Sequence, residues 1–326
     1  MNMTQARISI NGPNDLLTTI PLLLGFKPEH SLVVVGLAAR QLQCTFRVDL
    51  PGSADHLEHL PDLTGQLSLN ECDECVVVAY GEKEVAEASI ERAATRLFNA
   101  GIPPLDRLRV ADGRWFSLTC DKPCCPPEGT PIPETSPASC EVALAGCYAA
   151  ADRAEVAELL APAAPGRRAA VERAVAAALA AEADLDWATQ RSQDLHAIDH
   201  WMSTTALPGP DDIASIGLAL GDLDIRDYAI RRICTGQFES NRLDLWTWVT
   251  RHMADDLRAP AATVAGFAAY RFGNGVLALE AFDTALKSSP NYRLAQMLRA
   301  ALQAGYPPAS LANIGTAELE AAGREE

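Results

Sequence analysis

One stretch, Ser31-Leu32-Val33-Val34-Val35-Gly36-Leu37, decides the class of fold. It is apolar and rich in β-branched side chains without polar alternation, which is typical of a strand covered on both faces. A second strand of this kind is predicted at residues 75–80, and residues 82–100 carry the apolar spacing of an amphipathic helix. We therefore expect a sheet with helices packed against it in the first half of the chain.

The segments around these strands extend the prediction. Residues 6–10 alternate as a short strand, and Asn11-Gly12-Pro13 then predicts a turn that opens a buried helix. Residues 44–50 alternate as a strand with one polar face. Asp112-Gly113 lies between apolar runs and predicts a two-residue β-hairpin. These elements predict an α/β domain with a mixed sheet, whereas the leucine spacing in residues 53–69 predicts an irregular helix.

The character of the chain changes in its middle. Residues 120–140 are rich in proline and cysteine and predict a long irregular loop. Beyond about residue 150 the sequence becomes rich in alanine, and only helices are predicted. We therefore expect two domains, an α/β domain at residues 1–150 and an all-α domain of helical hairpins at residues 151–326.

One helical hairpin, near residues 260–305, has the spacing of a known repeat. Its matches to the roughly 34-residue tetratricopeptide pattern are small residues, an aromatic residue and a helix-ending proline. They are Gly266, Ala278, Phe282, Ala285 and Pro290. The helical domain is thus predicted to be tetratricopeptide-like in part, and arrays of this kind commonly bind proteins.

The composition and net charge of the chain limit the classes of binding partner and the cellular location that we expect. The formal net charge of −16 argues against binding to nucleic acid or anionic lipid and favours basic partners or small molecules. No apolar run approaches the roughly 20 residues of a membrane helix, and no secretory signal is recognised. We expect a cytoplasmic protein whose nine cysteines stay reduced.

Segments at residues 24–35, 46–51, 124–129, 225–227 and 273–290 carry a recognisable pattern. In these segments the sequence resembles an actinobacterial family known as domain of unknown function 4192. The resemblance implies a bacterial cytoplasmic setting, and it implies that the loop around Cys124 is a feature of the family. It implies no activity, substrate or cofactor. Cys72-Asp73-Glu74-Cys75 departs from the family pattern.

Three cysteines of the proline-rich loop are the main candidates for chemistry. Cys120, Cys124 and Cys125 are close in sequence, so their thiolates can converge on zinc or iron, with Cys140 or Cys147 as a fourth ligand. The spacing differs from the paired Cys-x2-Cys blocks of zinc sites. Unliganded thiols and thiol-redox pairing therefore remain open alternatives.

Cys72 and Cys75 have the Cys-x2-Cys spacing of redox and metal sites, but they precede a strand instead of a helix. Cys75 is expected to be strand core. The acidic residues between the two sulfurs are expected to raise both thiol pKa values.

A small-molecule pocket is the third candidate. Arg47 and Asp49 lie on the polar face of a strand near its carboxyl end, and His30 lies in the loop before the neighbouring strand. The alternative is an ion pair at a sheet edge.

Three functions follow from these features. The first is a non-enzymatic interaction or regulatory protein that binds a protein partner through the C-terminal helices. The second is a metal-binding or thiol-redox protein that uses Cys120, Cys124 and Cys125. The third is an enzyme with a pocket near Arg47 and Asp49, and no phosphate loop, dinucleotide fingerprint or nucleophile elbow accompanies it.

Overall fold

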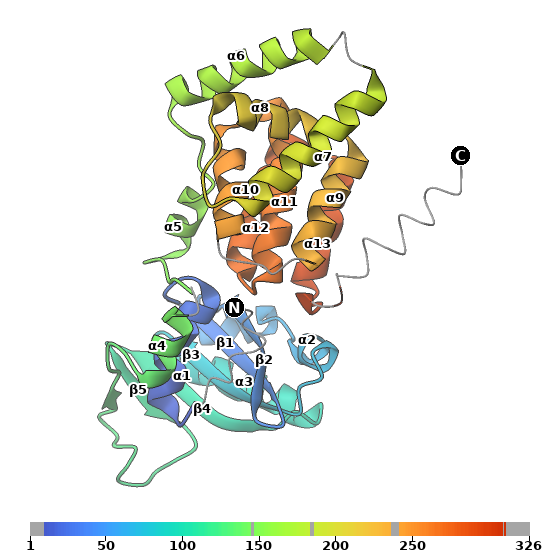
Figure 1. The fold of residues 1–326 in the computed structure, drawn as a ribbon. Coiled ribbons are helices and arrows are strands. Elements are labelled where there is room, and N and C mark those ends of the chain that lie inside the picture. The colour runs from blue at the N-terminus through green and yellow to red at the C-terminus, as the bar shows by residue number, and fades with distance from the viewer. Residues whose placement is uncertain (1–9, 145–146, 183–185, 236–240, 309, 311–326) are drawn as a thin grey trace. The chain divides into compact units, whose positions relative to one another are not determined.

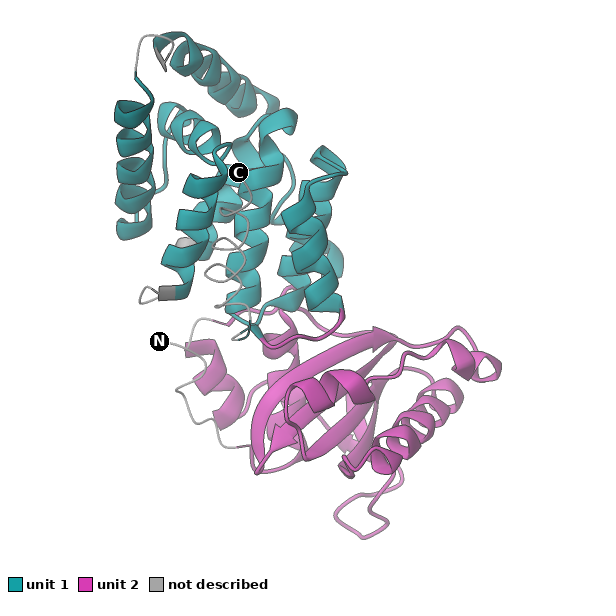
Figure 2. Cartoon of the chain, turned by 90° about the vertical axis from the view of Figure 1, so that its right-hand side faces the viewer, with its two compact units in different colours: residues 1–6, 153–303, 308–326 teal, residues 7–152, 304–307 magenta. Residues whose placement is uncertain are grey.

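The computed structural model describes residues 10–144, 147–182, 186–235, 241–308 and 310. The chain divides into two compact units, shown in Figure 2. The α/β unit contains residues 7–152 and 304–307, and the helical unit contains residues 153–303 and the segment from residue 308. The strand predicted at residues 6–10 lies outside the described residues, apart from Ile10.

The α/β unit is built on a six-stranded sheet with the order β2-β1-β3-β4-β5-β6. The strands are β1 (Ser31–Ala38), β2 (Gln41–Asp49), β3 (Glu74–Tyr80), β4 (Pro104–Ala111), β5 (Arg114–Ser117) and β6 (Thr130–Pro131). β1 pairs antiparallel with both β2 and β3, whereas β3 and β4 are parallel. The predicted mixed sheet is confirmed, and β1 is buried along most of its length.

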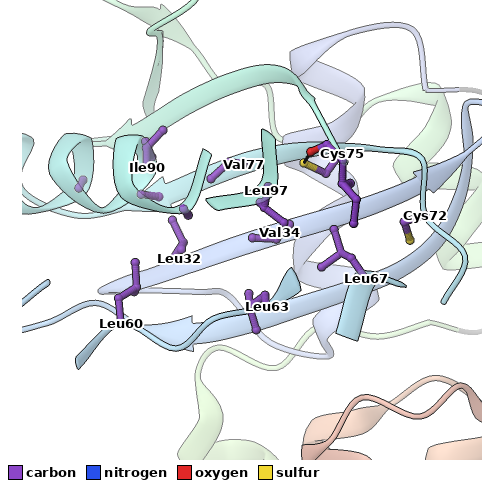
Figure 3. Packing of buried hydrophobic residues seen from close by; sticks show 14 residues of the cluster. Leu32, Val34, Leu60, Leu63, Leu67, Cys72, Cys75, Val77, Ile90 and Leu97 are labelled. Atoms are coloured by element: carbon purple, nitrogen blue, oxygen red, sulfur yellow. Dashed lines mark hydrogen bonds between the residues drawn. The ribbon is translucent and has the colours of Figure 1, made fainter. Parts of the chain in front are cut away.

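Helices cover both faces of this sheet (Figure 1). On one face α3 (Lys83–Asn99) and the segment around α2 (Thr64–Leu69) form a core with β1 and β3, shown in Figure 3. The predicted alternation of β2 is confirmed here, because Cys44, Phe46 and Val48 all pack against this core. α1 (Pro13–Leu24) and α4 (Pro137–Leu144) pack together toward the opposite side.

Local sequence signals explain where several elements begin and end. Pro13 begins α1, and Gly25, in the left-handed region at φ 81°, ends it. Asp112 and Gly113 both have positive φ between β4 and β5, which gives the predicted two-residue hairpin. The helix predicted in residues 53–69 is instead split into a 3₁₀ segment, Ala54–His59, and α2, because Pro61 interrupts the helical hydrogen bonds.

The predicted loop at residues 120–140 is shorter than expected. β6 lies within it, and α4 begins at Pro137, where proline is well tolerated at the start of a helix. Cys140 therefore lies on a helix. The irregular part of the segment runs from the end of β5 to β6.

The α/β unit also includes a short segment from the far end of the chain. Gly305 has φ 77°, and its carbonyl accepts a 2.8 Å hydrogen bond from the side-chain amide of Asn70. A Cβ at Gly305 would lie 2.5 Å from Cγ of Gln66, so only glycine fits this approach without a shift. No sequence signal indicated this return of the chain.

The helical unit consists of helices joined by short connections, with no strand among its described residues. Its helices are α5 (Arg153–Glu158), α6 (Pro165–Glu182), α7 (Trp187–Ser203), α8 (Pro210–Ala219), α9 (Leu223–Thr235), α10 (Asn241–His252), α11 (Arg258–Arg271), α12 (Gly275–Ser288) and α13 (Arg293–Gln303). Within the described residues no helix combines the length and apolar character needed to cross a membrane.

Close packing of α11 against α12 gives the predicted hairpin its geometry. Gly266 and Phe282 face each other, and Phe282 is fully buried. A Cβ on Gly266 would lie 2.5 Å from the Phe282 ring. The pairing of a small residue with an aromatic residue is therefore present, whereas the assignment to the tetratricopeptide class stays a prediction.

We predict that Gly266→Ala lowers the free energy of unfolding of the helical unit by about 1–3 kcal/mol, because the new methyl group overpacks the ring. The matched control is Gly275→Ala in the same hairpin, where the new Cβ meets only Leu302 at 3.5 Å. Urea unfolding followed by tryptophan fluorescence measures both, since four of the five tryptophans lie in this unit. Equal stability of the two variants would contradict the packing argument.

Candidate functional site

The loop that carries the three cysteines is anchored to the β4–β5 hairpin. Gly129, at φ 76°, packs so tightly on the ring of Phe116 that a Cβ would lie 2.7 Å from it. The guanidinium of Arg114 donates a 2.8 Å hydrogen bond to the Gly129 carbonyl. At the other end, the backbone N–H of Cys120 donates to Oγ of Ser117 at 3.0 Å. Both ends of the cysteine segment are therefore held on the sheet.

The three sulfurs of this segment lie together. Sγ of Cys120 is 3.7 Å from Sγ of Cys124, and Sγ of Cys125 is 4.0 Å from Sγ of Cys124. All three sulfurs lie within 4.8 Å of one another. Cys124 is exposed and the other two are half-buried, so the cluster is open to solvent. The structure thus brings together the three cysteines that the sequence singled out.

The thiols in the cluster differ in acidity. A backbone hydrogen bond from Lys122 and the two neighbouring thiols lower the pKa of Cys120. Desolvation and the hydrogen bond with Cys120 raise the pKa of Cys125 to about 12. Cys120 therefore ionises before Cys125 and is the better nucleophile or ligand of these two.

The fourth ligand expected from Cys140 or Cys147 is not part of the cluster. Cys140 is exposed on α4 and Cys147 is half-buried, and among the described residues no further His, Cys, Asp or Glu group joins the three thiols. A second group of possible ligands, His56, Glu58 and His59, is fully exposed on a short 3₁₀ segment. Exposed groups of this kind are common without a metal.

The residues of the predicted pocket lie at the edge strand β2. Nη2 of Arg47 is 2.6 Å from Oδ1 of Asp49, and its Nε donates to Oγ of Ser31 at 2.8 Å. The guanidinium also lies over the Phe26 ring. His30 is exposed, with a positive φ of 43°. The structure brings Arg47 and Asp49 together as an ion pair, and the pocket itself stays a prediction.

The Cys-x2-Cys spacing does not produce a paired site. Cys75 is fully buried, as expected of strand core, and its thiol donates to the Ile102 carbonyl at 3.7 Å. Sγ of Cys72 lies 3.5 Å from Sγ of Cys44 instead. The expectation that both pKa values are raised is wrong for Cys72, because the hydrogen bond from Cys44 lowers it. Sequence spacing could not reveal a partner 28 residues away.

The helical unit contains a cleft that sequence reasoning missed. It has a volume of about 270 Å³. It is lined by Leu179, Trp187, Gln190, Arg191, Asp194, Leu218, Ala219 and Asp222. Trp187 is 71% exposed and Leu179 is 52% exposed, so large apolar side chains face solvent beside charged ones. The available signal in the sequence was a tryptophan directly after a candidate helix N-cap, Asp186.

Comparison with known families now adds to this geometry. A family model described as domain of unknown function 4192 matches residues 13–309. The chain belongs to this family. No curated protein and no solved structure matches it significantly. The matched region spans most of both units and includes the three-thiol loop, so this member of the domain of unknown function 4192 family carries the candidate site within the family region.

We predict that metal-free protein is alkylated at Cys120 before Cys125 near neutral pH. The lowered pKa of Cys120 gives it a larger thiolate fraction, whereas Cys125, with a pKa of about 12, stays protonated until strongly alkaline pH. Limiting iodoacetamide followed by peptide mass spectrometry across a pH series measures the order. Faster labelling of Cys125 at every pH would refute the assigned acidities.

Proposed function

We propose that this protein binds a thiophilic metal ion, of the zinc type, through Cys120, Cys124 and Cys125. The observation that carries the proposal is the triangle of sulfurs in the anchored loop. A tetrahedral zinc ion with Zn–S bonds of roughly 2.3 Å requires sulfurs roughly 3.8 Å apart. Two sides of the triangle measure 3.7 and 4.0 Å, so little movement is needed for coordination.

The chemistry of the donors supports the same ion class. Three thiolates form a soft ligand set that favours zinc, copper(I) or iron–sulfur chemistry over magnesium or calcium. Binding displaces the thiol protons, and the acidic Cys120 gives the first thiolate at least cost. The raised pKa of Cys125 makes affinity fall as pH falls, because protons compete with the metal for this sulfur.

Three protein ligands leave one coordination position open. Closed structural zinc sites use four protein ligands, whereas sites with three keep a position for water or an incoming group. Cys124 is exposed, so that position faces solvent. We therefore propose a metal that stays accessible to an exogenous ligand. It would not be a structural metal that stabilises a protein core.

We predict that protein reduced and stripped of metal binds one equivalent of zinc or cobalt(II). Cobalt binding should give the intense near-ultraviolet absorption of thiolate coordination, and Cys124→Ser should weaken affinity at least about 100-fold. Cys140→Ser is the matched control, because Cys140 is also exposed but lies outside the cluster. Elemental analysis of anaerobically purified protein measures its zinc, iron and copper content.

Gly129→Ala tests the anchoring without removing a sulfur. The added methyl group collides with Phe116 at an unfavourable φ, and the loop should shift so that cobalt affinity falls. Less than about a tenth of an equivalent of bound metal, with equal affinity for Cys124→Ser and Cys140→Ser, would overturn the proposal.

A second candidate function, binding of a basic protein segment, is supported by the cleft in the helical unit. Trp187 and Leu179 offer apolar contacts, and Asp194 and Asp222 lie beside them in a chain of net charge −16. Arg191 is held by Asp222 at 3.3 Å and by Asp224 at 2.9 Å. The occupant proposed is a peptide with a hydrophobic anchor flanked by arginine or lysine.

We predict that Trp187→Ala weakens binding of such a peptide about tenfold or more, because it removes the exposed aromatic contact. Fluorescence polarisation of labelled arginine-flanked peptides selected from a library measures the affinity. Leu144→Ala is the control, since Leu144 is an exposed leucine of the α/β unit. Equal loss in both variants, or no peptide selected, would contradict this role.

A further inference from the structure

A separate pair of cysteine sulfurs lies close together on one face of the sheet. Neither cysteine belongs to the three-thiol loop. Cys44 lies on the edge strand β2, and Cys72 lies in the segment before β3. Both strands flank β1. The two sulfurs are 3.5 Å apart above β1, although 28 residues separate them in the chain. Their approach is a product of sheet register and not of sequence proximity.

Gly36 on β1 makes this approach sterically feasible. Gly36 is the register partner of Cys44, and a Cβ built on it would lie 2.7 Å from Sγ of Cys44 and 2.5 Å from Sγ of Cys72. Any other residue would occupy the space in which the two sulfurs meet. Gly36 has no positive φ, so the backbone does not require glycine at this position.

We infer that Cys44 and Cys72 form a reversible disulfide when the protein meets a peroxide or a small-molecule disulfide. The sulfurs need to close from 3.5 Å to roughly 2.05 Å to form the bond. The inference is independent of metal binding, because neither residue belongs to the three-thiol cluster.

The chemistry balances with hydrogen peroxide as the oxidant. The thiolate of Cys72 attacks one peroxide oxygen, the O–O bond breaks, and hydroxide leaves and takes up a proton to become water. The resulting sulfenic acid is attacked by the sulfur of Cys44. The S–S bond forms, the S–O bond breaks, and a second water leaves. Two thiols have lost two electrons and two protons to one peroxide.

Acidity supports the roles of the two sulfurs. The hydrogen bond from Cys44 lowers the pKa of Cys72 and raises that of Cys44, with burial adding to the latter. Burial and, more weakly, the charge of Asp73 act in the opposite direction on the pKa of Cys72, but the hydrogen bond outweighs them. Cys72 is thus the attacking thiolate, and Cys44 is the resolving thiol that stays protonated until the sulfenic acid forms.

The cross-link would tie the edge strand of the sheet to its interior. Among the described residues, β2 pairs with β1 along one side and has no partner strand along the other. A bond to Cys72 adds a covalent tie across β1 and shortens the unfolded chain between residues 44 and 72. Oxidation should therefore raise resistance to unfolding, and reduction should reverse that gain.

Peptide mapping of the full-length protein tests the inference. Reduced protein is treated with low concentrations of hydrogen peroxide, or separately with glutathione disulfide, and remaining thiols are alkylated after denaturation. Digestion must cut between Cys72 and Cys75, either before Asp73 or after Glu74. The expected product is a linked peptide of Cys44 and Cys72, with Cys75 recovered alkylated.

Three variants sharpen the result. Cys75→Ser should keep the cross-link, whereas Cys72→Ser should lose it together with the oxidant-dependent rise in urea midpoint. Gly36→Ala should slow cross-linking by pushing the sulfurs apart. Recovery of Cys44 and Cys72 as free thiols after oxidation, or linkage of Cys72 mainly to Cys75 or to Cys124, would overturn the inference. The wild-type map decides the question even if a variant fails to fold.

Discussion

Burial of β1 between two antiparallel neighbours is the constraint on which the α/β unit depends. Ser31 to Gly36 is buried, and its backbone groups are paired with β2 on one side and β3 on the other. A one-residue slip would turn the valines of β1 to the wrong faces. Fixed register then brings Cys44 on β2 close to Cys72 in the segment before β3, although no local pattern connects them.

The parallel pairing of β3 with β4 determines where the cysteine loop lies. A parallel connection needs a crossover, and α3 supplies it while completing the core on one face. β4 then turns through Asp112-Gly113 into β5. The guanidinium of Arg109 lies over the ring of Phe116 on β5, 3.9 Å from its centre, and Gly129 packs against the same ring. The metal-binding proposal thus rests on a loop held by the sheet, and not on a freely moving segment.

The sequence predicted those parts of the fold that local patterns determine. β1, α3 and the β4–β5 hairpin follow from apolar periodicity and from one Asp-Gly pair, which act over a few residues. The sequence indicated only an irregular helix where Pro61 breaks it. It did not predict α4, because a proline such as Pro137 is typical both of loops and of helix starts. Gly305 could not be placed, since its contact with Asn70 spans 235 residues.

The same distinction explains which cysteines could be interpreted from the sequence. A turn of the loop brings together the sulfurs of Cys120, Cys124 and Cys125, because these residues are near neighbours in sequence. Their spacing in the sequence therefore indicates the cluster. The sequence pairs Cys72 with its neighbour Cys75, but Cys72 lies before β3 and Cys75 lies on it. Its actual partner, Cys44, is reached only through the register of β1 with two strands. Local spacing therefore identifies thiol sites in loops, whereas thiol pairs across a sheet require knowledge of strand order.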